Sequence, residues 1–522
     1  MIKRSLFLAG TSLLMVACSP TQQPEALKTA ELTAPAFIGS PATPKPFEGK
    51  PADNLFMAPH SKSTMHSDGY NSDVHSAMGP LGINPQMTTR SGSKLPGGMC
   101  ATVTFDQQGQ LVALCASLVG FELQLLAPRS LELLARYELP SRPSSFQALV
   151  KRDRDIIMSD TSGGAYYYLD DKDRVVLADS TQTIIRVGHT QDEQGNWSFN
   201  LENSWDLSKD VPNDCMDWGN WFPSDECDPI TAVMPDSNGL IWWVTRYGRI
   251  GTLNPENGSI KGIRLDNEEI QNGFSVDQNA VYIVSDHATY SMKAGADDSP
   301  QTLWKETYDR GSARKVGSIN QGSGTTPTLI GDQYITVTDN ADEKINLLVY
   351  RREANFEGDR LICSVPLFSA GQSSTDNSMI GYGRSIIIEN NFGYTNAMEH
   401  KDWKAVKGGI SRIDIREDES GCDTTWTSSE KAPSVVPKLS SANGLAYFYT
   451  FEPQEGAEDV AWYLMALDAE TGKTTFKIRT GAGQQFDNNW APISIGPDGT
   501  AYIGTLNGIL AIWDDNRHSP ER

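Results

Sequence analysis

The chain has 522 residues, with 66 acidic and 44 basic side chains, so its formal charge is −22. Hydrophobic residues make up 39% and charged residues 21%, which is the composition of a globular protein. Proteins bind nucleic acids largely through basic side chains, which release the counterions of the phosphates. This chain has no basic excess, so we exclude a nucleic-acid partner. The length is ample for a large buried core.

The first residues form a targeting segment. Lys3 and Arg4 precede a short apolar run that cannot span a bilayer. The four residues that end in Cys18 (MVAC) resemble the lipobox of bacterial lipoproteins, with Met15 where that family prefers Leu. The resemblance implies removal of residues 1–17, a lipid on Cys18 and, because Ser19 is not Asp, delivery to the outer membrane. Ordinary secretion is the alternative.

Composition divides the rest of the chain. Residues 18–55 contain the lipidated Cys and are rich in proline, which predicts a disordered or polyproline tether. Residues 56–96 follow as an N-terminal cap segment, and residues 78–99 contain a candidate strand for closing the repeat domain. That domain occupies residues 97–514, and residues 515–522 form a tail.

One hairpin recurs along the repeat domain, with two apolar runs rich in β-branched and aromatic residues around a polar turn. It occurs at 101–115, 165–179, 230–245, 274–286, 326–340, 378–390, 434–450 and 491–505. A second pair of strands follows the first seven hairpins, as at 121–139, 250–265, 410–426 and 463–480. This pattern predicts an all-β, eight-bladed β-propeller of four-stranded antiparallel blades, with seven blades as the alternative.

One turn carries a family resemblance. Residues 466–472 (ALDAETG), together with Phe476, resemble the docking motif of quinoprotein (pyrroloquinoline quinone, PQQ) dehydrogenase-like propellers, with Phe476 in place of the usual Trp. The resemblance implies that Asp468 and Gly472 shape the turn and that the aromatic ring wedges between blades. It covers about residues 97–514 and does not by itself imply an enzyme, because non-catalytic assembly lipoproteins share the repeat.

Six cysteines remain after Cys18, and an even number in an exported protein favours disulfides. We expect Cys100–Cys115 across the first hairpin, Cys215–Cys227 around a loop, and Cys363–Cys422 between equivalent places in neighbouring repeats. Free buried thiols are the alternative.

The long connections gather on one face of the predicted ring, at 206–229, 309–325, 369–377, 395–407, 451–461 and 481–490. Polar residues end the second strand of most units and point to this face. We predict that they form a ligand or cation site, with Asp286, Asp339 and Glu389 suited to Ca²⁺. The full set is Asp179, Arg246, Asp286, His287, Asp339, Asn340, Glu389, Asn390 and Asn391. The alternative is that the residues at strand ends are polar only because they are exposed to solvent.

Two further groups are weaker candidates. His60, His66 and His75 could ligate a transition metal, with Asp68 or Asp73 assisting, or they belong to a polar cap segment. Trp218 and Trp221, with Trp403 and Trp490 on other loops, would form an aromatic floor for a ligand or would pack the loops down.

The sequence favours a membrane-anchored binding or assembly module at the outer membrane, on its periplasmic side or the cell surface, that holds a protein or small-molecule ligand on one propeller face. The second hypothesis is a PQQ- and calcium-dependent oxidoreductase, although the chain has no adjacent Cys–Cys pair and no C-x-x-C-H haem site. The third is a hydrolase or lyase of a sugar polymer. No complete catalytic motif decides whether the protein is an enzyme.

Overall fold

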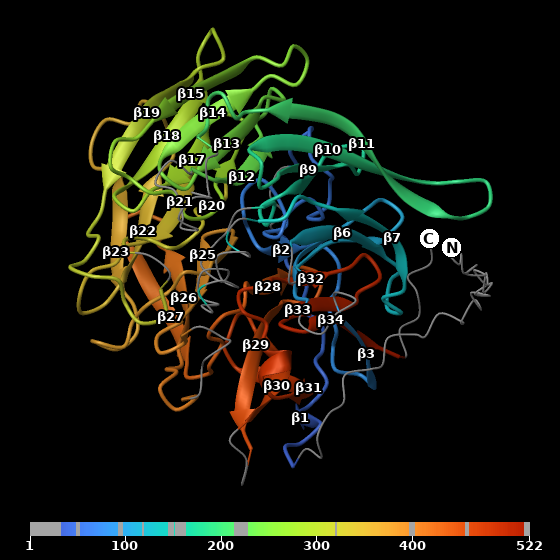
Figure 1. Ribbon diagram of the computed structural model, residues 1–522. Helices are drawn as coiled ribbons and strands as arrows, with labels where there is room; N and C mark the ends of the chain where they lie inside the picture. Colours follow the sequence, from blue (N-terminus) through green and yellow to red (C-terminus); the bar gives the residue numbers. More distant parts are fainter. Residues whose placement is uncertain are drawn as a thin grey trace, which may run out of the picture.

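The computed structural model describes residues 33–48, 53–91, 98–116, 120–142, 163–212, 228–318, 321–395, 402–454 and 459–515, with residues 144 and 151. Eight antiparallel sheets stand in a ring (Figure 1), and each is built on four strands. The fold is therefore an all-β, eight-bladed propeller, and the prediction is confirmed.

The first four blades follow the chain, and within each blade the first strand lies innermost. Blade 1 contains β4 (Cys100–Phe105), β5 (Leu111–Ala116), β6 (Phe121–Leu126) and β7 (Leu133–Glu138). Blade 2 contains β8 (Tyr168–Leu169), β9 (Val175–Ala178) and the long hairpin of β10 (Thr183–Gln191) and β11 (Trp197–Asp206), which projects from the ring (Figure 1). Blade 3 contains β12 (Ile230–Pro235), β13 (Ile241–Thr245), β14 (Arg249–Leu253) and β15 (Ile260–Arg264). Blade 4 contains β16 (Ser275–Val276), β17 (Val281–Val284), β18 (Ala288–Ala294) and β19 (Pro300–Thr307).

The other four blades complete the ring. Blade 5 contains β20 (Thr328–Ile330), β21 (Tyr334–Thr338), β22 (Asn346–Arg351) and β23 (Leu361–Pro366), and blade 6 contains β24 (Ile380–Tyr382), β25 (Ser385–Glu389), β26 (Ile410–Ile415) and β27 (Cys422–Ser428). Blade 7 contains β28 (Lys438–Ser440), β29 (Leu445–Pro453), β30 (Val460–Asp468) and β31 (Thr474–Ala482), followed by a short 3₁₀ helix, η1 (Gln484–Phe486). Blade 8 contains β32 (Ile493–Ile495), β33 (Ala501–Thr505) and β34 (Gly508–Asp514).

Hydroxyl side chains on the inner strands join one blade to the next. Thr102 donates to the carbonyl of Ala165 at 2.7 Å, from blade 1 to the entry of blade 2. Three more pairs repeat this contact at 2.9–3.2 Å: Ser275 to Pro327, Thr328 to Met379, and Ser494 to Val103. A ring of eight sheets thus gains polar contacts between inner strands whose apolar faces are already buried.

The turn that resembles the quinoprotein motif docks blade 6 onto blade 7. The indole nitrogen of Trp426, on β27, donates to the carbonyl of Ala469 at 3.1 Å. A Cβ on Gly472 would lie 2.5 Å from the Trp426 ring, so only glycine lets the ring approach the turn. The ring between the blades is therefore Trp426 of the preceding blade, whereas Phe476 is buried and stacks on Phe37.

The N-terminal side of the domain closes the ring. Strand β3 (Pro85–Ser91) pairs with β34 over its whole length and supplies the outer strand of blade 8, as predicted. The carboxylate of Asp514 accepts hydrogen bonds from the backbone N–H groups of Leu81, Gly82 and Ile83 at 2.7–3.1 Å. This one side chain holds the chain just before the closing strand.

Part of the predicted tether is folded onto blade 7. Strand β1 (Phe37–Gly39) pairs antiparallel with β31 as a fifth strand on the outer edge. Residues 42–47 then hydrogen-bond to Leu81, Asn443 and Ser441 through the backbone. The expectation of a free tether over residues 18–55 is thus wrong for residues 33–48, because Phe37 covers the Phe476 ring.

An inner belt, residues 58–75, runs around the inside of the ring and includes β2 (Val74–His75), which pairs in parallel with β28 near the centre of Figure 1. Its carbonyls accept hydrogen bonds from the inner strands of six blades in chain order. The donors are the N–H groups of Phe105, Leu169, Val276, Leu329, Gly381 and Leu439, and the acceptors are Lys62, Ser63, Gly69, Tyr70, Ser72 and Asp73. Because most of these amides lie at or near the hairpin ends of the inner strands, the belt fills that end of the channel.

Two of the three expected disulfides lie within the described residues. Cys100–Cys115 bridges the first hairpin, and Cys363–Cys422 joins the outer strands of blades 5 and 6. Both predictions are confirmed. The Cys215–Cys227 prediction lies outside the described residues.

We predict that Asp514→Ala destabilises the ring closure. It leaves three partly or fully buried amides without their acceptor, and hydrogen bonds to charged groups are worth about 1.5–3 kcal/mol each. Thermal unfolding should begin at lower temperature, and the amides of residues 81–91 should lose hydrogen-exchange protection. The neighbouring, exposed Asp515→Ala is the matched control, and equal behaviour of the two variants would contradict the clasp.

Candidate functional site

The connections differ strongly between the two faces of the ring. On the face with the hairpin turns, the turn face, the longest connection spans residues 352–360 between β22 and β23. On the opposite, loop-rich face, connections run over 139–167, 207–229, 308–327 and 390–409. The predicted gathering of long segments on one face is therefore present in the fold, and the inner belt lies at the other end of the channel.

Several predicted ligand residues on the loop-rich face hold the long connections in place. The side-chain amide of Asn340 donates to the carbonyls of Arg310 and Ala313 at 2.9 and 3.1 Å. Asn390 and Asn391 do the same for the connections around them, and Asn391 donates to Pro433 O at 2.7 Å. All three asparagines are nearly fully buried, so their amides serve the fold.

Three of the predicted carboxylates also serve as hydrogen-bond acceptors for neighbouring protein groups. Asp179 accepts hydrogen bonds from Thr181 and Asp339 from Asn346, so both close turns. Burial raises the pKa of Asp339. Glu389 is fully buried, and burial raises its pKa well above the ordinary value. Its Oε1 accepts from the Asn377 amide at 2.6 Å, while Oε2 has no hydrogen-bond partner.

The remaining predicted residues, Arg246, Asp286 and His287, lie in a partly exposed group on blades 3 and 4. Together with Glu269 and Arg310, which the sequence did not point to, they form the mouth cluster. Arg246 Nε lies 3.4 Å from Glu269 Oε2. The Asp286 carboxylate forms an ion pair with the Arg310 guanidinium at 2.5 Å and lies 2.8 Å from His287 Nδ1. Among the predicted strand-end residues that the structure describes, the three in this cluster are the most exposed to solvent.

A second polar group lies buried where the inner belt meets blades 6 and 7. The ammonium of Lys438 and the carboxylate of Asp73 form an ion pair, and both side chains are fully buried. The Ser378 hydroxyl donates to Asp73 at 2.5 Å and lies 2.9 Å from His66 Nδ1. We call Asp73, Lys438, His66 and Ser378 the belt lock, because they join the belt to two blades.

Electrostatics explain which members of this region are charged. Burial works against ionisation of Asp73, but the ammonium of Lys438 and the neighbouring His66 ring hold its pKa below the usual value. Burial raises the pKa of nearby Asp68 to about 7, although Ser72 donates hydrogen bonds to its carboxylate. Burial lowers the pKa of His75 to about 3, so its ring is neutral at physiological pH. Asp73 is therefore held ionised beside Lys438, whereas burial favours the uncharged forms of Asp68 and His75.

The structure does not bring the predicted metal ligands together. Within the described ranges, no group of three or more His, Cys, Asp or Glu side chains is arranged to hold a metal ion. Asp286, Asp339 and Glu389 each bond protein groups on different blades. His66 and His75 are buried in the belt, and His60 is exposed at its start.

The loop tryptophans that the structure describes pack against other aromatic rings. Trp403 lies 4.9 Å from Phe451 and 5.3 Å from Trp462, measured between ring centroids. Trp490 meets Tyr394 edge to face at 5.1 Å. For these two tryptophans the packing alternative describes what is observed, whereas Trp218 and Trp221 lie outside the described residues.

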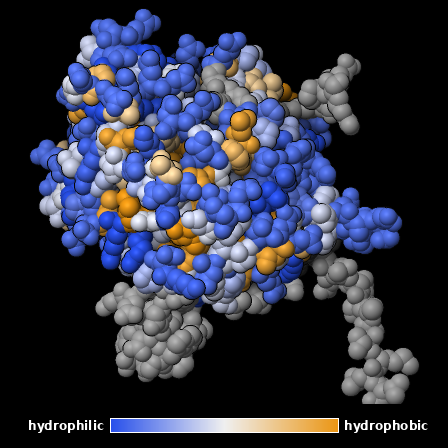
Figure 2. Space-filling view, turned by 90° about the horizontal axis from the view of Figure 1, so that it is seen from above, coloured by the Kyte–Doolittle hydropathy of each residue, from blue (hydrophilic) through white to orange (hydrophobic). Residues whose placement is uncertain are grey.

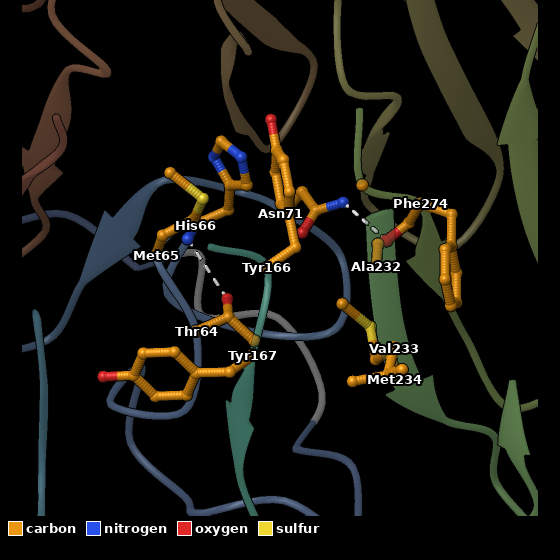
Figure 3. A pocket seen from close by; sticks show the side chains of 11 residues that line it. Thr64, Met65, His66, Asn71, Tyr166, Tyr167, Ala232, Val233, Met234 and Phe274 are labelled. Atoms are coloured by element: carbon orange, nitrogen blue, oxygen red, sulfur yellow. Dashed lines mark hydrogen bonds between the residues drawn. The ribbon is translucent and has the colours of Figure 1, made fainter. Parts of the chain in front are cut away.

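A small cavity lies between the belt and blades 2 to 4 (Figure 3). It is lined by Thr64, Met65, His66, Asn71, Tyr166, Tyr167, Ala232, Val233, Met234, Gly273 and Phe274. Its volume is about 10 Å³, close to what a single water requires. It cannot take a substrate.

Sequence reasoning grouped His66 and Asp73 as candidate metal ligands and missed their role in the belt lock. Lys438 is the one available signal, because it stands in a run of otherwise apolar and small residues, VVPKLSS, that forms an inner strand. A lysine in such a strand requires a buried anion. The partner, Asp73, lies hundreds of residues away in the chain, so spacing could not identify it.

No protein-family model matches the chain. An uncharacterized protein of Archaeoglobus fulgidus is 24% identical over 317 residues, which is 55% of this chain and 61% of that protein. The chain thus matches less than two thirds of the length of this relative.

Solved structures similar to this chain include other propellers. Sqt1 of Chaetomium thermophilum, bound to the N-terminus of ribosomal protein L10, has a TM-score of 0.48 and 9% identity, and the match covers 89% of this chain and 100% of Sqt1. The computationally designed Ika8 protein has a TM-score of 0.42, 10% identity and coverages of 81% and 98%. Likeness at this level carries no argument about function.

A buried acid beneath the loop-rich face gives a test of these electrostatics. Burial raises the pKa of Asp487 to about 7, although its Oδ1 accepts from Tyr394 and from the Asn489 backbone at 3.0 Å. The folded state therefore keeps a proton that the unfolded chain releases near pH 4. The contribution of Asp487 to stability should fall as pH rises from about 4 to about 7 and then level off.

We predict that Asp487→Asn flattens this decline. The Asn carbonyl keeps both hydrogen bonds at Oδ1 and carries no charge to bury. The loss of unfolding free energy between pH 4 and 7 should shrink by at most about 4 kcal/mol, because one pKa unit is worth about 1.4 kcal/mol. Denaturant unfolding at several pH values measures it, and the exposed Asp171→Asn is the control. A decline as steep as in the unmodified protein would contradict the assignment.

Proposed function

We propose that the protein is an exported, lipid-anchored binding or assembly module whose protein partner docks on the loop-rich face. The observation that carries the proposal is the mouth cluster, whose accessible charges are held on a rigid ring while the inner belt fills the other end of the channel. Binding residues commonly lie on loops that a rigid scaffold positions.

The surface supports a polar rather than an apolar docking mode. In the described part of the chain, the large exposed hydrophobic residues are Leu55, Phe56, Ile83, Met87, Leu201, Tyr247 and Val316, which are spread over different elements. On the side shown in Figure 2, hydrophobic residues form small separate patches in a mainly hydrophilic surface. Half-exposed ion pairs contribute specificity and association rate more than affinity. With a chain charge of −22, a basic partner surface fits best.

The path of the N-terminal segment supports a membrane-proximal partner. Strand β1 runs antiparallel to β31, so residue 33 lies at the loop-rich end of blade 7, near Tyr463 and Arg479. A lipid on Cys18 would connect to that point through a stretch at most about 50 Å long. The anchor would therefore hold the loop-rich face near the bilayer, which favours a partner in or on the same membrane. No helix of the described residues is long and apolar enough to cross a membrane.

Kinship with the quinoprotein-like repeat is part of the proposal. It is supported by the ALDAETG turn and by the way Trp426 docks on Gly472. The oxidoreductase hypothesis has less support than the binding hypothesis, because the carboxylates proposed for calcium lie on separate blades and bond protein groups.

We predict that Glu269→Gln/Asp286→Asn abolishes capture of a basic partner. Full-length protein with an affinity tag is recovered from detergent-solubilised membranes, and co-purified proteins are quantified by mass spectrometry. A partner retained by the unmodified protein should fall at least about tenfold in the variant, because interface charges that pair across a contact carry a few kcal/mol.

The matched control is Asp171→Asn/Glu193→Gln, which neutralises two exposed carboxylates on the turn face. It should retain the partner. Equal loss in both variants, or equal retention, would contradict docking on the loop-rich face.

A further inference from the structure

We propose that a groove at the outer rim of the loop-rich face, between blades 5 and 6, binds a carboxylate-bearing sugar. The groove has a volume of about 460 Å³, within the usual range for small-molecule sites of about 300–1,000 Å³. It lies outside the mouth cluster, on other blades, so the inference is independent of the docking proposal.

The walls of the groove carry hydroxyl groups in unusual number. One wall is the connection after β23, and the other is the sheet of β26 and β27 with the residues that follow. The hydroxyls belong to Ser369, Ser411, Thr424, Thr427, Ser428 and Ser429. A hydroxyl both donates and accepts, which matches the alternating donors and acceptors of a sugar. Ser411 and Thr427 already lie 3.0 Å apart as a hydrogen-bonded pair.

Two glycines form part of the floor. A Cβ on Gly408 would lie 2.1 Å from the carbonyl oxygen of Ser429, and a Cβ on Gly409 would lie 2.6 Å from the Phe368 ring. Gly409 also has φ of +145° and Phe368 has φ of +58°, which is rare for an aromatic residue. The backbone is thus strained at the point where the Phe368 ring lies against the backbone of Gly409. Such a ring gives a sugar an apolar face to stack on.

The charge of the lining selects for an anion. Although the chain has 66 acidic residues, no Asp or Glu lines the groove, and its one charged lining residue is Lys407. Lys407 stands among hydroxyl and backbone groups of the lining, so an anionic ligand in the groove would find one cation and no carboxylate there. Cationic ligands are therefore disfavoured, and a single carboxylate is favoured.

The groove is also held open by a covalent bond. The Cys363–Cys422 disulfide joins β23 to β27, close in sequence to the wall residues Pro366 and Thr424. It fixes the distance between the two outer strands, so a ligand does not have to order the walls when it binds. Pre-organisation of this kind lowers the cost of binding.

The test uses digalacturonate as the acidic probe and its dimethyl ester as the neutral one. Saturation-transfer NMR and calorimetry on the full-length protein should give saturable binding of the acid with a dissociation constant of about 1 mM or tighter. The ester should bind at least about fivefold more weakly. No saturable binding of the acid up to about 10 mM would overturn the proposal, and so would equal affinity for the two probes.

Variants locate the site. Lys407→Met should weaken the acid at least about tenfold and the ester less than twofold, because the charge pair is lost and the hydroxyl contacts stay. Thr427→Val, which is nearly isosteric, should weaken both probes about threefold or more. Lys404→Met, at an exposed lysine outside the groove, is the control and should bind both probes normally. If both groove variants fold, as judged by their thermal midpoints, and bind like the unmodified protein, the site is not this groove.

Discussion

The buried ion pair of Asp73 and Lys438 is the interaction on which the arrangement of the ring depends most. It joins the inner belt to an inner strand at a point that water does not reach. Burying two charges is costly, and the cost is offset only if the geometry and the remaining hydrogen bonds are good. Ser378 supplies a donor to Asp73, and His66 adds its ring, so the carboxylate is well solvated by protein. Removing the lysine alone would leave a buried anion and cost about 3–5 kcal/mol.

The belt lock limits which parts of the ring a ligand can reach. The belt gives its carbonyls to successive inner strands only if it follows the inner wall closely, and the ion pair fixes its last turn before β2. With the belt in place, ligands can reach the ring through the loop-rich face and the outer rim but not through the turn-side end of the channel. The two proposed surfaces, the mouth cluster and the rim groove, both belong to the loop-rich side of the ring.

Local sequence predicted much of the fold. Hairpins such as 326–340 could be recognised because alternating β-branched residues and short polar turns determine pairing over a few residues. The closing strand could be predicted because the last repeat, ending at Asp514, lacks one strand. The belt could not be predicted, because Ser67, Asn71 and Asp73 adopt positive φ values that let the chain curve and leave no periodic pattern.

The candidate site was predicted only in part. The lengths of the connections located the loop-rich face, but polarity at strand ends did not separate Asn391, which holds a connection, from Arg246, which is partly exposed. That difference depends on which long loop covers each strand end, and such packing is not encoded in the neighbouring residues. The rim groove was missed for the same reason, since Ser411 and Ser369 come from different blades.

The most direct test of the account is hydrogen–deuterium exchange of residues 61–75 in the unmodified protein and in Lys438→Met. If the belt is a locked part of the ring, its amides should exchange as slowly as those of the inner strands in the unmodified protein. In the variant they should exchange much faster, while the blades stay protected. Fast exchange of the belt in the unmodified protein would contradict the central claim, and so would a belt that stays protected in the variant.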